Sequence, residues 1–435
     1  MIAEIVSNGM LSLPSSLATV GIAPGIILIV FLGSFATYTS YLLVNFKLRH
    51  PEVHNMGDAG FILFGPIGRE VLAFGTVVFA IFATGGQLLA GQIALASLSD
   101  EKLCNMVYTG IFAAGTLALS WPRTMDKLGW ISVASVVSIL VAGIVGMAGA
   151  GIAPVEGRVV DVVKSSDFYT AFFSITNPVF AYAVSRTSSV LWKNDTDRDT
   201  QGHFMFFILM SEMKRPEDAM KAGMYQVWSS NAHKPLTHSP KAYTLQTFAT
   251  TFYAVFAAIT YVYLGNSVQS PSFSSLAPVW QKAAYGIALP NFLMAGALYA
   301  HTAAKLFFVR IFRHSRHLHS HTVLGWSVWL ALVLLVNVAA FVLAVGVPVF
   351  NYLIGLAASL FAAWYTYGIA GMFFLHDVWA DEGGSRGWKR RSGQSLVAVF
   401  TVAVGAFICV AGCYVSIKGI VEAYASGQVP GAFVC

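Results

Sequence analysis

The residues best suited to chemistry lie within an apolar segment at positions 2–20. Glu4 comes first, Ser7, Asn8 and Gly9 follow, and Pro14 lies beyond them. A carboxylate at the centre of a bilayer costs about 2.5–3.5 kcal/mol on insertion scales. Gly and Pro weaken helical hydrogen bonding where no water replaces it, so freed backbone groups must face a protein-lined cavity. The segment predicts either an ordinary kinked helix or a discontinuous helix that carries a polar binding site.

A second apolar segment, at 168–183 and 202–211, is interrupted in a similar way. Asn177 and Pro178 lie in its first half, and His203 opens its second half. Glu4 and His203 are therefore titratable side chains at membrane depth beside the two breaks, and both are candidate proton carriers. The alternative is that Glu4 caps freed backbone and that His203 is a hydrogen-bonded core residue.

Composition places the chain in a membrane. Of its 435 residues, 56% are hydrophobic and only 11% are charged, and the mean hydropathy is +0.67. A soluble domain carries about 25% charged residues, so we predict an all-α protein that crosses the bilayer many times. The net charge of +6 does not indicate nucleic acid, because Lys and Arg gather in the cytoplasmic loops of membrane proteins.

The positions of the basic residues predict the topology. They cluster in alternate loops, at 47–69, 123–127, 214–221, 310–316 and 386–391. By the positive-inside rule, this pattern predicts a cytoplasmic N-terminus and an outside C-terminus. Eleven spans, the sixth interrupted, are expected at 2–20, 22–46, 70–98, 104–121, 128–152, 168–183 with 202–211, 243–265, 283–309, 323–345, 348–375 and 394–422.

The sequence shows no spacing typical of a metal site or an enzyme. Cys409 and Cys413 lie one turn apart in an apolar run and are expected in the core. The histidines between 314 and 321 accompany Arg313 and Arg316 in a loop, which favours a basic surface near anionic headgroups over a metal site. No Gly-rich phosphate loop or hydrolase motif occurs. We therefore expect a protein that is not an enzyme and needs no metal or cofactor.

Several motifs occur in an order that is specific to one family. They are SNGMLSLPSSLATVG at 7–21, HPEVHNMGDAGFILFGPIGRE at 50–70, GGQLLAGQ at 85–92 and, when 183 is joined to 202, FAYAGHFMFF followed by SEMKRPEDAMKA at 211–222. With them the chain resembles the amino acid/auxin permease family, and in detail the fungal neutral amino acid permeases. The resemblance covers nearly all of the chain except 184–201 and 223–241. It implies a single transporter domain of the amino acid/polyamine/organocation architecture, an inverted repeat with broken helices one and six.

The resemblance also implies where the substrate binds. Free N–H groups at the two breaks would hold an amino acid carboxylate, and free C=O groups its ammonium. Phe180, Tyr182 and Met10 would line an apolar pocket, which favours neutral amino acids. Of Gln87 and Gln92, at membrane depth on the third span, one is expected to face the site. Carried over residue by residue, the substrate-binding positions are Ser7, Asn8, Gly9, Met10, Leu11, Gln87, Phe180, Ala181, Tyr182, Ala183, Gly202 and His203, and the proton-coupling candidates are Glu4 and His203.

Residues 184–201 depart from the family pattern. They place six charged side chains in a span expected to be apolar, at a cost on the order of 15–20 kcal/mol if all were buried. We interpret this stretch as a retained intron translated in frame, because Val184 can begin with the donor GT and Gln201 can end in CAG. Residues 223–241 break the resemblance in the same way and receive the same interpretation. A lineage-specific insertion is the alternative in both places.

The first segment is short for a half-helix with a basic flank, so the N-terminus is expected to be truncated. The combined expectation is a secondary transporter that moves neutral amino acids by proton symport. Its expected partners are a neutral amino acid, a proton and the lipid bilayer, without nucleic acid, and the oligomeric state is left open. We expect a multi-pass protein of the fungal plasma membrane rather than the vacuolar membrane. A non-transporting amino acid sensor on the same fold and an inactive product of a mis-spliced gene are the alternatives.

Overall fold

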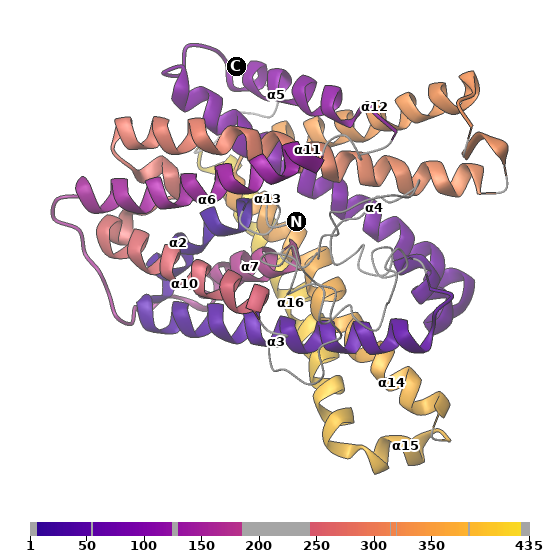
Figure 1. The fold of residues 1–435 in the computed structure, drawn as a ribbon. Helices are drawn as coiled ribbons and strands as arrows, with labels where there is room; N and C mark the ends of the chain where they lie inside the picture. Colours follow the sequence, from indigo (N-terminus) through magenta and orange to yellow (C-terminus); the bar gives the residue numbers. More distant parts are fainter. Residues whose placement is uncertain are drawn as a thin grey trace, which may run out of the picture.

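The computed structural model describes residues 7–53, 55–123, 129–184, 244–313, 315–318, 320–381 and 383–427. These residues form helices and connecting turns, and no strand occurs among them (Figure 1). The helices are α2 (Asn8–Val20), α3 (Ile22–Arg49), α4 (Met56–Leu98), α5 (Asn105–Ser120), α6 (Gly129–Ile152), α7 (Phe168–Val184), α10 (Thr244–Leu264), α11 (Pro278–Phe312), α12 (Val323–Gly346), α13 (Phe350–Ala357), the π-helix η8 (Ala358–Gly368), α14 (Ile369–Asp381), α15 (Ser385–Arg390) and α16 (Ser392–Ala425), with short 3₁₀ turns η5 (Gly265–Ser267), η6 (Ser272–Ser275) and η7 (Arg316–Leu318).

The described helices match the expected spans. Eight of them, or continuous runs of them, are long and apolar enough to cross a membrane. α2, α5 and α7 are shorter, with 13, 16 and 17 residues, and occupy the places of the first, fourth and sixth expected spans. The prediction of an all-α, many-span protein is therefore confirmed. Residues 1–6 and 185–243 lie outside the described part, so the predicted insertions and N-terminal truncation stay predictions.

The long helix α4 contains a built-in turn. Gly65 has φ 65° and ψ −151°, values that interrupt the helix. The two pieces then approach closely, because a Cβ at Gly60 would lie 2.4 Å from the carbonyl oxygen of Gly68. Nη2 of Arg69 is 3.1 Å from Oδ1 of Asp58 and closes the hairpin. The glycine-rich motif at 50–70 thus folds the chain back before α4 enters the bundle.

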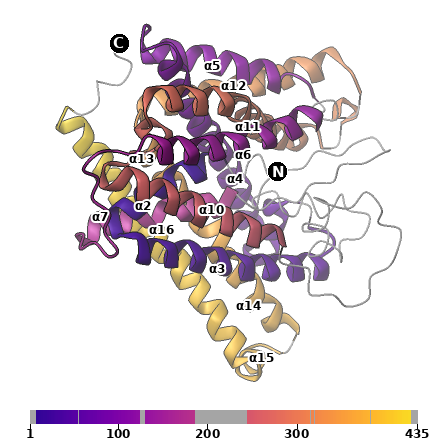
Figure 2. The same ribbon diagram turned by 60° about the vertical axis from the view of Figure 1, so that its left-hand side comes forward.

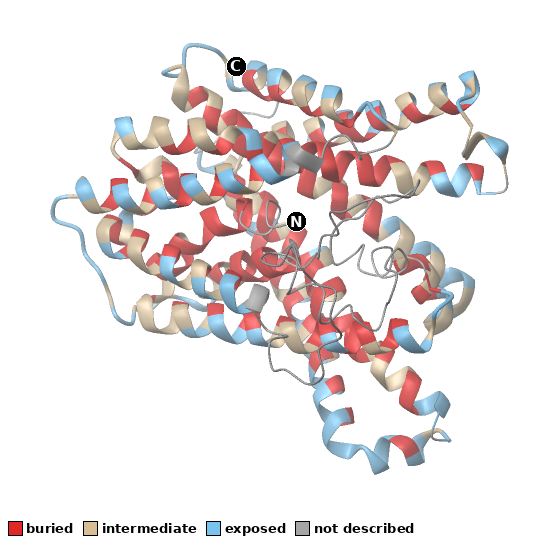
Figure 3. Ribbon diagram, viewed as in Figure 1, coloured by how far each residue is buried: buried red, intermediate tan, exposed pale blue. Residues whose placement is uncertain are grey.

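The two helices that carry the expected breaks pack against each other in opposite directions. Near one end of the pair, Gly9 of α2 faces Ala181 of α7. Further along, the Ser16 hydroxyl donates to the carbonyl of Ser174 at 2.9 Å and accepts from Asn177 Nδ2 at 3.2 Å. α2 and α7 lie side by side (Figures 1 and 2), and buried residues are concentrated where they meet (Figure 3).

The carboxyl end of α2 is capped by the segment that precedes α7. Lys164 donates to the carbonyl of Ala18 from its Nζ at 2.9 Å and to that of Val20 from its backbone N–H at 3.0 Å. Ser166 donates from its hydroxyl to the carbonyl of Thr19. Gly21, with φ 95°, lets the chain turn into α3. α2 and α7 are therefore tied together at this end as well as along their contact.

Charged loops separate to opposite ends of the long helices. Nζ of Lys282, at the start of α11, is 2.6 Å from Oδ1 of Asp100, and this contact holds the pKa of the Asp100 carboxyl below its usual range. The other end of α11 carries Arg310, which pairs with Glu70. With 35 residues, α11 is about 50 Å long. The pair of Glu70 on α4 and Arg310 on α11 therefore lies at the opposite end of α11 from the mixed-charge loop at Asp100.

α16 packs on its neighbours through four small residues spaced by seven. They are Ala398, Gly405, Gly412 and Gly419. A Cβ at Gly405 would lie 2.8 Å from Cα of Gly368 in η8, and one at Gly412 would lie 2.1 Å from the Ser359 hydroxyl oxygen. At Gly405 the backbones of α16 and the π-helix therefore approach with no side chain between them, and at Gly412 only the small Ser359 side chain fits. We call these four positions the glycine seam.

Candidate functional site

The start of α2 is joined to α4 by a buried polar pair. The Ser7 hydroxyl and the Gln87 side-chain amide lie 3.1–3.2 Å apart, and both residues are at most 3% exposed. Gln87 also packs on Gly296 of α11, where a Cβ would lie 3.3 Å from the Cβ of Gln87. Ser7 is the N-cap residue of α2, but its hydroxyl makes no capping bond to the helix. It bonds instead to Gln87 and so holds the start of α2 against α4.

Asn8 presents a buried amide that lacks partners. It is 2% exposed, and neither Nδ2 nor Oδ1 forms a hydrogen bond within the described part of the chain. The amide faces Gly86 of α4, where a Cβ would lie 3.3 Å from Nδ2. Leaving a buried donor or acceptor unpaired costs about 1–3 kcal/mol. A donor and an acceptor are therefore available at the end of α2 for a group that can satisfy both.

The start of α2 lies directly against the end of α7. A Cβ at Gly9 would lie 2.6 Å from Cα of Ala181, so only glycine permits this contact. Phe180, Ala181 and Ala183 are 3%, 0% and 1% exposed, and the Tyr253 hydroxyl of α10 donates to the carbonyl of Ala181 at 3.5 Å. The N-terminus of α2 and the C-terminus of α7 are thus adjacent, and their helix dipoles have opposite signs there.

The apolar site residues point to different neighbours. Met10 and Leu11 are fully buried, and Sδ of Met10 would be 3.3 Å from a Cβ at Gly143 of α6. The Tyr182 ring stacks edge-on with Tyr253, at 5.6 Å between centroids. Its hydroxyl would be 2.8 Å from a Cβ at Gly33 of α3. Met10 therefore lies toward α6 and Tyr182 toward α3 and α10.

The structure brings together most of the predicted positions that it describes. Ser7 pairs with Gln87, Asn8 faces Gly86, the residue before Gln87, and Gly9 adjoins Ala181. Gln92 is buried at 8% exposure, but the described contact with Ser7 belongs to Gln87. Glu4, Gly202 and His203 lie outside the described residues.

Sequence reasoning missed the residues that give the site its shape. Gly86 and Gly143 leave room for Asn8 and Met10, and Tyr253 reaches the end of α7. Gly86 lies inside the motif GGQLLAGQ, so a signal for it was present. Gly143 and Tyr253 lie in apolar runs whose pattern does not distinguish them from other lipid-facing or core positions.

Comparison with solved structures identifies the fold. The chain is similar to a Na⁺-coupled sialic acid symporter solved in a substrate-bound, outward-open state, with a TM-score of 0.54 and 11% sequence identity. The match covers 96% of this chain and 88% of that one. At this identity the likeness shows the fold alone, and it confirms the predicted transporter architecture.

Comparison with known sequences points to fungal transporters. The chain is 28% identical to a transmembrane transporter of Gibberella moniliformis, over 98% of this chain and 83% of the relative. It is 26% identical to an N amino acid transport system protein of Neurospora crassa, over 100% of this chain and 86% of the relative.

The family match divides at the charged stretch. The model of the transmembrane amino acid transporter protein family matches residues 1–191 and 201–418. The interval 192–200 falls inside the predicted insertion 184–201, whereas the match runs through 223–241. The origin of both stretches stays a prediction. Because the match extends over most of the chain and agrees with its helical, many-span fold, the chain belongs to the transmembrane amino acid transporter family.

Proposed function

We propose that the protein is a secondary transporter that carries neutral amino acids across a membrane together with protons. The observation that carries this proposal is the Asn8 amide, which is buried without a hydrogen bond among the described residues and faces Gly86 of α4, one residue before the contact of Gly9 with α7. A zwitterion supplies both an acceptor and a donor for this amide. Substrate binding would therefore satisfy groups that the protein alone leaves unpaired.

Helix dipoles give the proposed site its orientation. The first turn of α2 directs backbone N–H groups toward its N-terminal end, and that end favours an anion. The last turn of α7 directs carbonyl groups toward its C-terminal end, which favours a cation. Since Gly9 and Ala181 are in contact, these two ends lie together. We infer that the carboxylate binds at α2 and the ammonium at α7.

The residues around the breaks favour an uncharged side chain. Residues 7–13, 84–90 and 177–183 contain no Asp, Glu, Lys or Arg. A charged substrate side chain placed there would be buried without an opposite charge from these segments, which is unfavourable. Aliphatic and aromatic amino acids meet no such penalty beside Met10 and Phe180.

Proton coupling rests on Glu4 and His203, which flank the two breaks in the sequence. Both side chains can gain and lose a proton in a desolvated site. We propose that one or both carry the coupled proton. The alternating loop charges support a cytoplasmic N-terminus, and we propose the plasma membrane as the location.

Uptake by proteoliposomes tests the proposal. The purified chain is reconstituted, an inward proton gradient is imposed in sodium-free buffer, and uptake of labelled neutral, acidic and basic amino acids is measured. We expect accumulation of neutral amino acids that collapses with a protonophore, and loss of the gradient effect in Glu4→Gln or His203→Gln. An uptake rate that is the same with and without the proton gradient contradicts proton coupling.

A second measurement separates the alternatives. Equilibrium binding of the same amino acids is measured on the detergent-solubilised chain. Binding without any uptake indicates a sensor. Neither binding nor uptake by this chain, with both restored when 184–201 and 223–241 are removed, indicates a mis-spliced product.

A further inference from the structure

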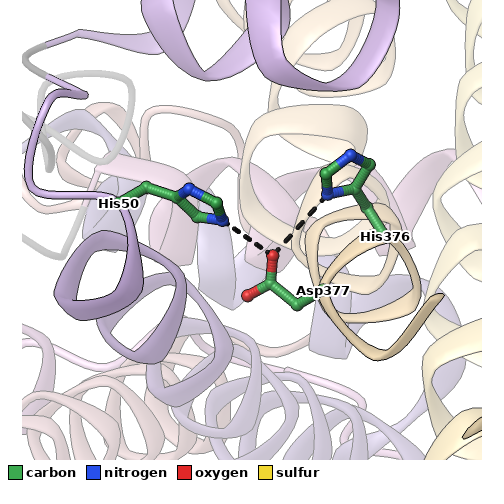
Figure 4. Close-up of side chains that lie close together, drawn as sticks. All are labelled: His50, His376 and Asp377. Carbon is green, nitrogen blue, oxygen red and sulfur yellow. Dashed lines mark hydrogen bonds and ion pairs between the residues drawn. The ribbon is translucent and has the colours of Figure 1, made fainter. Parts of the chain in front are cut away.

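A second group of chemistry-bearing side chains lies where α3 and α14 end, at the basic end of the molecule. His50 follows the last residue of α3, and His376 and Asp377 lie on α14. Nε2 of His50 is 3.0 Å from Oδ1 of Asp377, and Nδ1 of His376 is 3.7 Å from the same oxygen. Figure 4 shows the two rings approaching this oxygen from opposite sides.

We propose that His50, His376 and Asp377 form a binding site for a divalent transition metal ion, with Zn²⁺ as its best-matched occupant. Two imidazole nitrogens and one carboxylate oxygen are a donor set that zinc accepts, with water in the remaining position. The three ligand atoms lie within 4.8 Å of one another. No other such group of three occurs among the residues that the structure describes.

The distances are close to those that a zinc ion requires. With bonds of about 2.0–2.2 Å, tetrahedral zinc holds its ligand atoms about 3.3–3.5 Å apart. The two separations from Oδ1 of Asp377, 3.0 and 3.7 Å, lie on either side of this range, and the two imidazole nitrogens lie within 4.8 Å of each other. The side chains of His50 and His376 are 25% and 32% exposed, so their rings have room to turn toward the ion.

Two of the ligand groups are buried in a way that suits a bound cation. The Asp377 side chain is only 6% exposed. Nδ1 of His376 is buried and forms no hydrogen bond within the described part of the chain. A metal ion would give this nitrogen the partner that it lacks and would neutralise the buried carboxylate.

The groups behind the ligands orient them as in known metal sites. Nδ1 of His50 is 3.3 Å from Oε1 of Glu52, so Nδ1–H can donate to this carboxylate when the lone pair of Nε2 binds an ion. Arg49 lies 3.6 Å from the other oxygen of Asp377 and 2.8 Å from Asp381. Arg49 thus pairs with two carboxylates and holds Asp377 from the side opposite His50 and His376.

The scaffold beneath the site is rigid. One turn before the ligands, the rings of Phe46 on α3 and Phe373 on α14 stack with centroids 4.1 Å apart. Lys47 donates to the carbonyls of Pro51, at 2.9 Å, and Val53, and so holds the turn that carries His50. A bound ion would link the end of α3 to α14, through His50 and Asp377, which are 327 positions apart in the chain.

Zinc binding to the purified full chain tests this proposal. The histidines at 314, 317, 319 and 321 are first changed together to Gln, so that the basic loop contributes no binding. The metal is stripped with EDTA, and Zn²⁺ alone is then titrated by calorimetry and followed by thermal unfolding. We expect one ion per chain, micromolar affinity and a higher melting temperature with zinc.

Single substitutions in that background identify the ligands. His50→Gln, His376→Gln and Asp377→Asn should each weaken binding at least about tenfold, and Glu52→Gln about tenfold through His50. Lys389→Met, on exposed α15, is the matched control and should change nothing. His376→Gln keeps the test decisive if Asp377→Asn fails to fold, because its Nδ1 makes no hydrogen bond to lose. Equal affinity in His376→Gln, or no saturable binding up to about 1 mM zinc, overturns the proposal and leaves an ion-pair cluster only.

Discussion

At the scale of single residues, the site depends on positions where a hydrogen atom is all that fits. Gly9 is the clearest case, since a Cβ there would lie 2.6 Å from Cα of Ala181. Gly9→Ala must push α2 and α7 apart, and overpacking of this kind costs about 1–3 kcal/mol. We expect a lower melting temperature in detergent and uptake reduced at least about tenfold.

The control for this prediction lies in α5. A Cβ at Gly110 would meet no atom within 4 Å. Gly110→Ala should therefore leave uptake unchanged and stabilise the helix by about 0.5–1 kcal/mol. Equal effects of the two substitutions would show that the contact between Gly9 and Ala181 is not required.

Gln87 is the second residue with a specific expectation. Gln87→Met keeps the length of the side chain but leaves the Ser7 hydroxyl without its described partner. The start of α2 would lose its hydrogen bond to α4, and the lost bond is worth about 0.5–1.5 kcal/mol. We expect a higher KM for uptake, with Gln92→Met as the matched control on the same helix. A larger effect at Gln92 would reverse the assignment of the two glutamines.

At the scale of helices, the cap of α2 makes a separate prediction. Lys164 bonds the carbonyls of Ala18 and Val20 and ties α2 to the segment before α7. Lys164→Met removes the side-chain bond but keeps the backbone bond, so the loss should be about 0.5–1.5 kcal/mol. Thermal unfolding measures it, and Lys389→Met again serves as the control. A melting temperature equal to that of the control would show that the cap adds no stability.

The positions of most helices could be predicted because each such helix corresponds to one continuous apolar run in the sequence. The expected span at 323–345 is observed as Val323–Gly346, and that at 243–265 as Thr244–Leu264. The π-helical segment Ala358–Gly368 could not be foreseen, because hydrophobicity alone does not reveal a change of hydrogen-bond register. The turn at Gly65 was also missed, although Gly65 and Pro66 lie together in the sequence.

The candidate site was predictable only in part. Ser7 and Gln87 were singled out because polar side chains stand out in apolar helices. The hydrogen bond between them was not predicted, since 80 residues separate Ser7 from Gln87 in the chain. The same limit hid the proposed zinc site, whose ligands come from the two ends of the chain and share no local spacing. Contacts of this kind are set by helix packing and leave no signature in one segment.

At the scale of the whole molecule, loop charges predict how the protein sits in the membrane. Glu156 and Arg386 are exposed and belong to loops expected on opposite sides. Glu156→Cys should react with a membrane-impermeant maleimide on intact cells, whereas Arg386→Cys should react only after permeabilisation. Labelling of both from outside would contradict the proposed topology.

The pH dependence of transport should not come from the outer ion pair. Lys282 holds the pKa of the Asp100 carboxyl below its usual range. A depressed pKa means that the pair contributes above the unfolded pKa, about 3.9, and is lost only as pH falls through the lower folded value. At an external pH of about 5 the pair is intact. Asp100→Asn should therefore keep the pH profile of uptake, unlike Glu4→Gln.

The glycine seam has a consequence for how related sequences diverge. A Cβ at Gly412 would lie 2.1 Å from the Ser359 hydroxyl oxygen, and one at Gly371 would lie 2.0 Å from that of Thr401. At Gly412 both of the nearest atoms belong to the Ser359 side chain, so a larger residue at 412 requires a smaller one at 359. At Gly371 the backbone carbonyl of Ala398 also lies 2.4 Å from the added Cβ, so a smaller residue at 401 would not make room. In natural relatives Gly412 and Ser359 should therefore vary as a pair, whereas Gly371 should stay glycine.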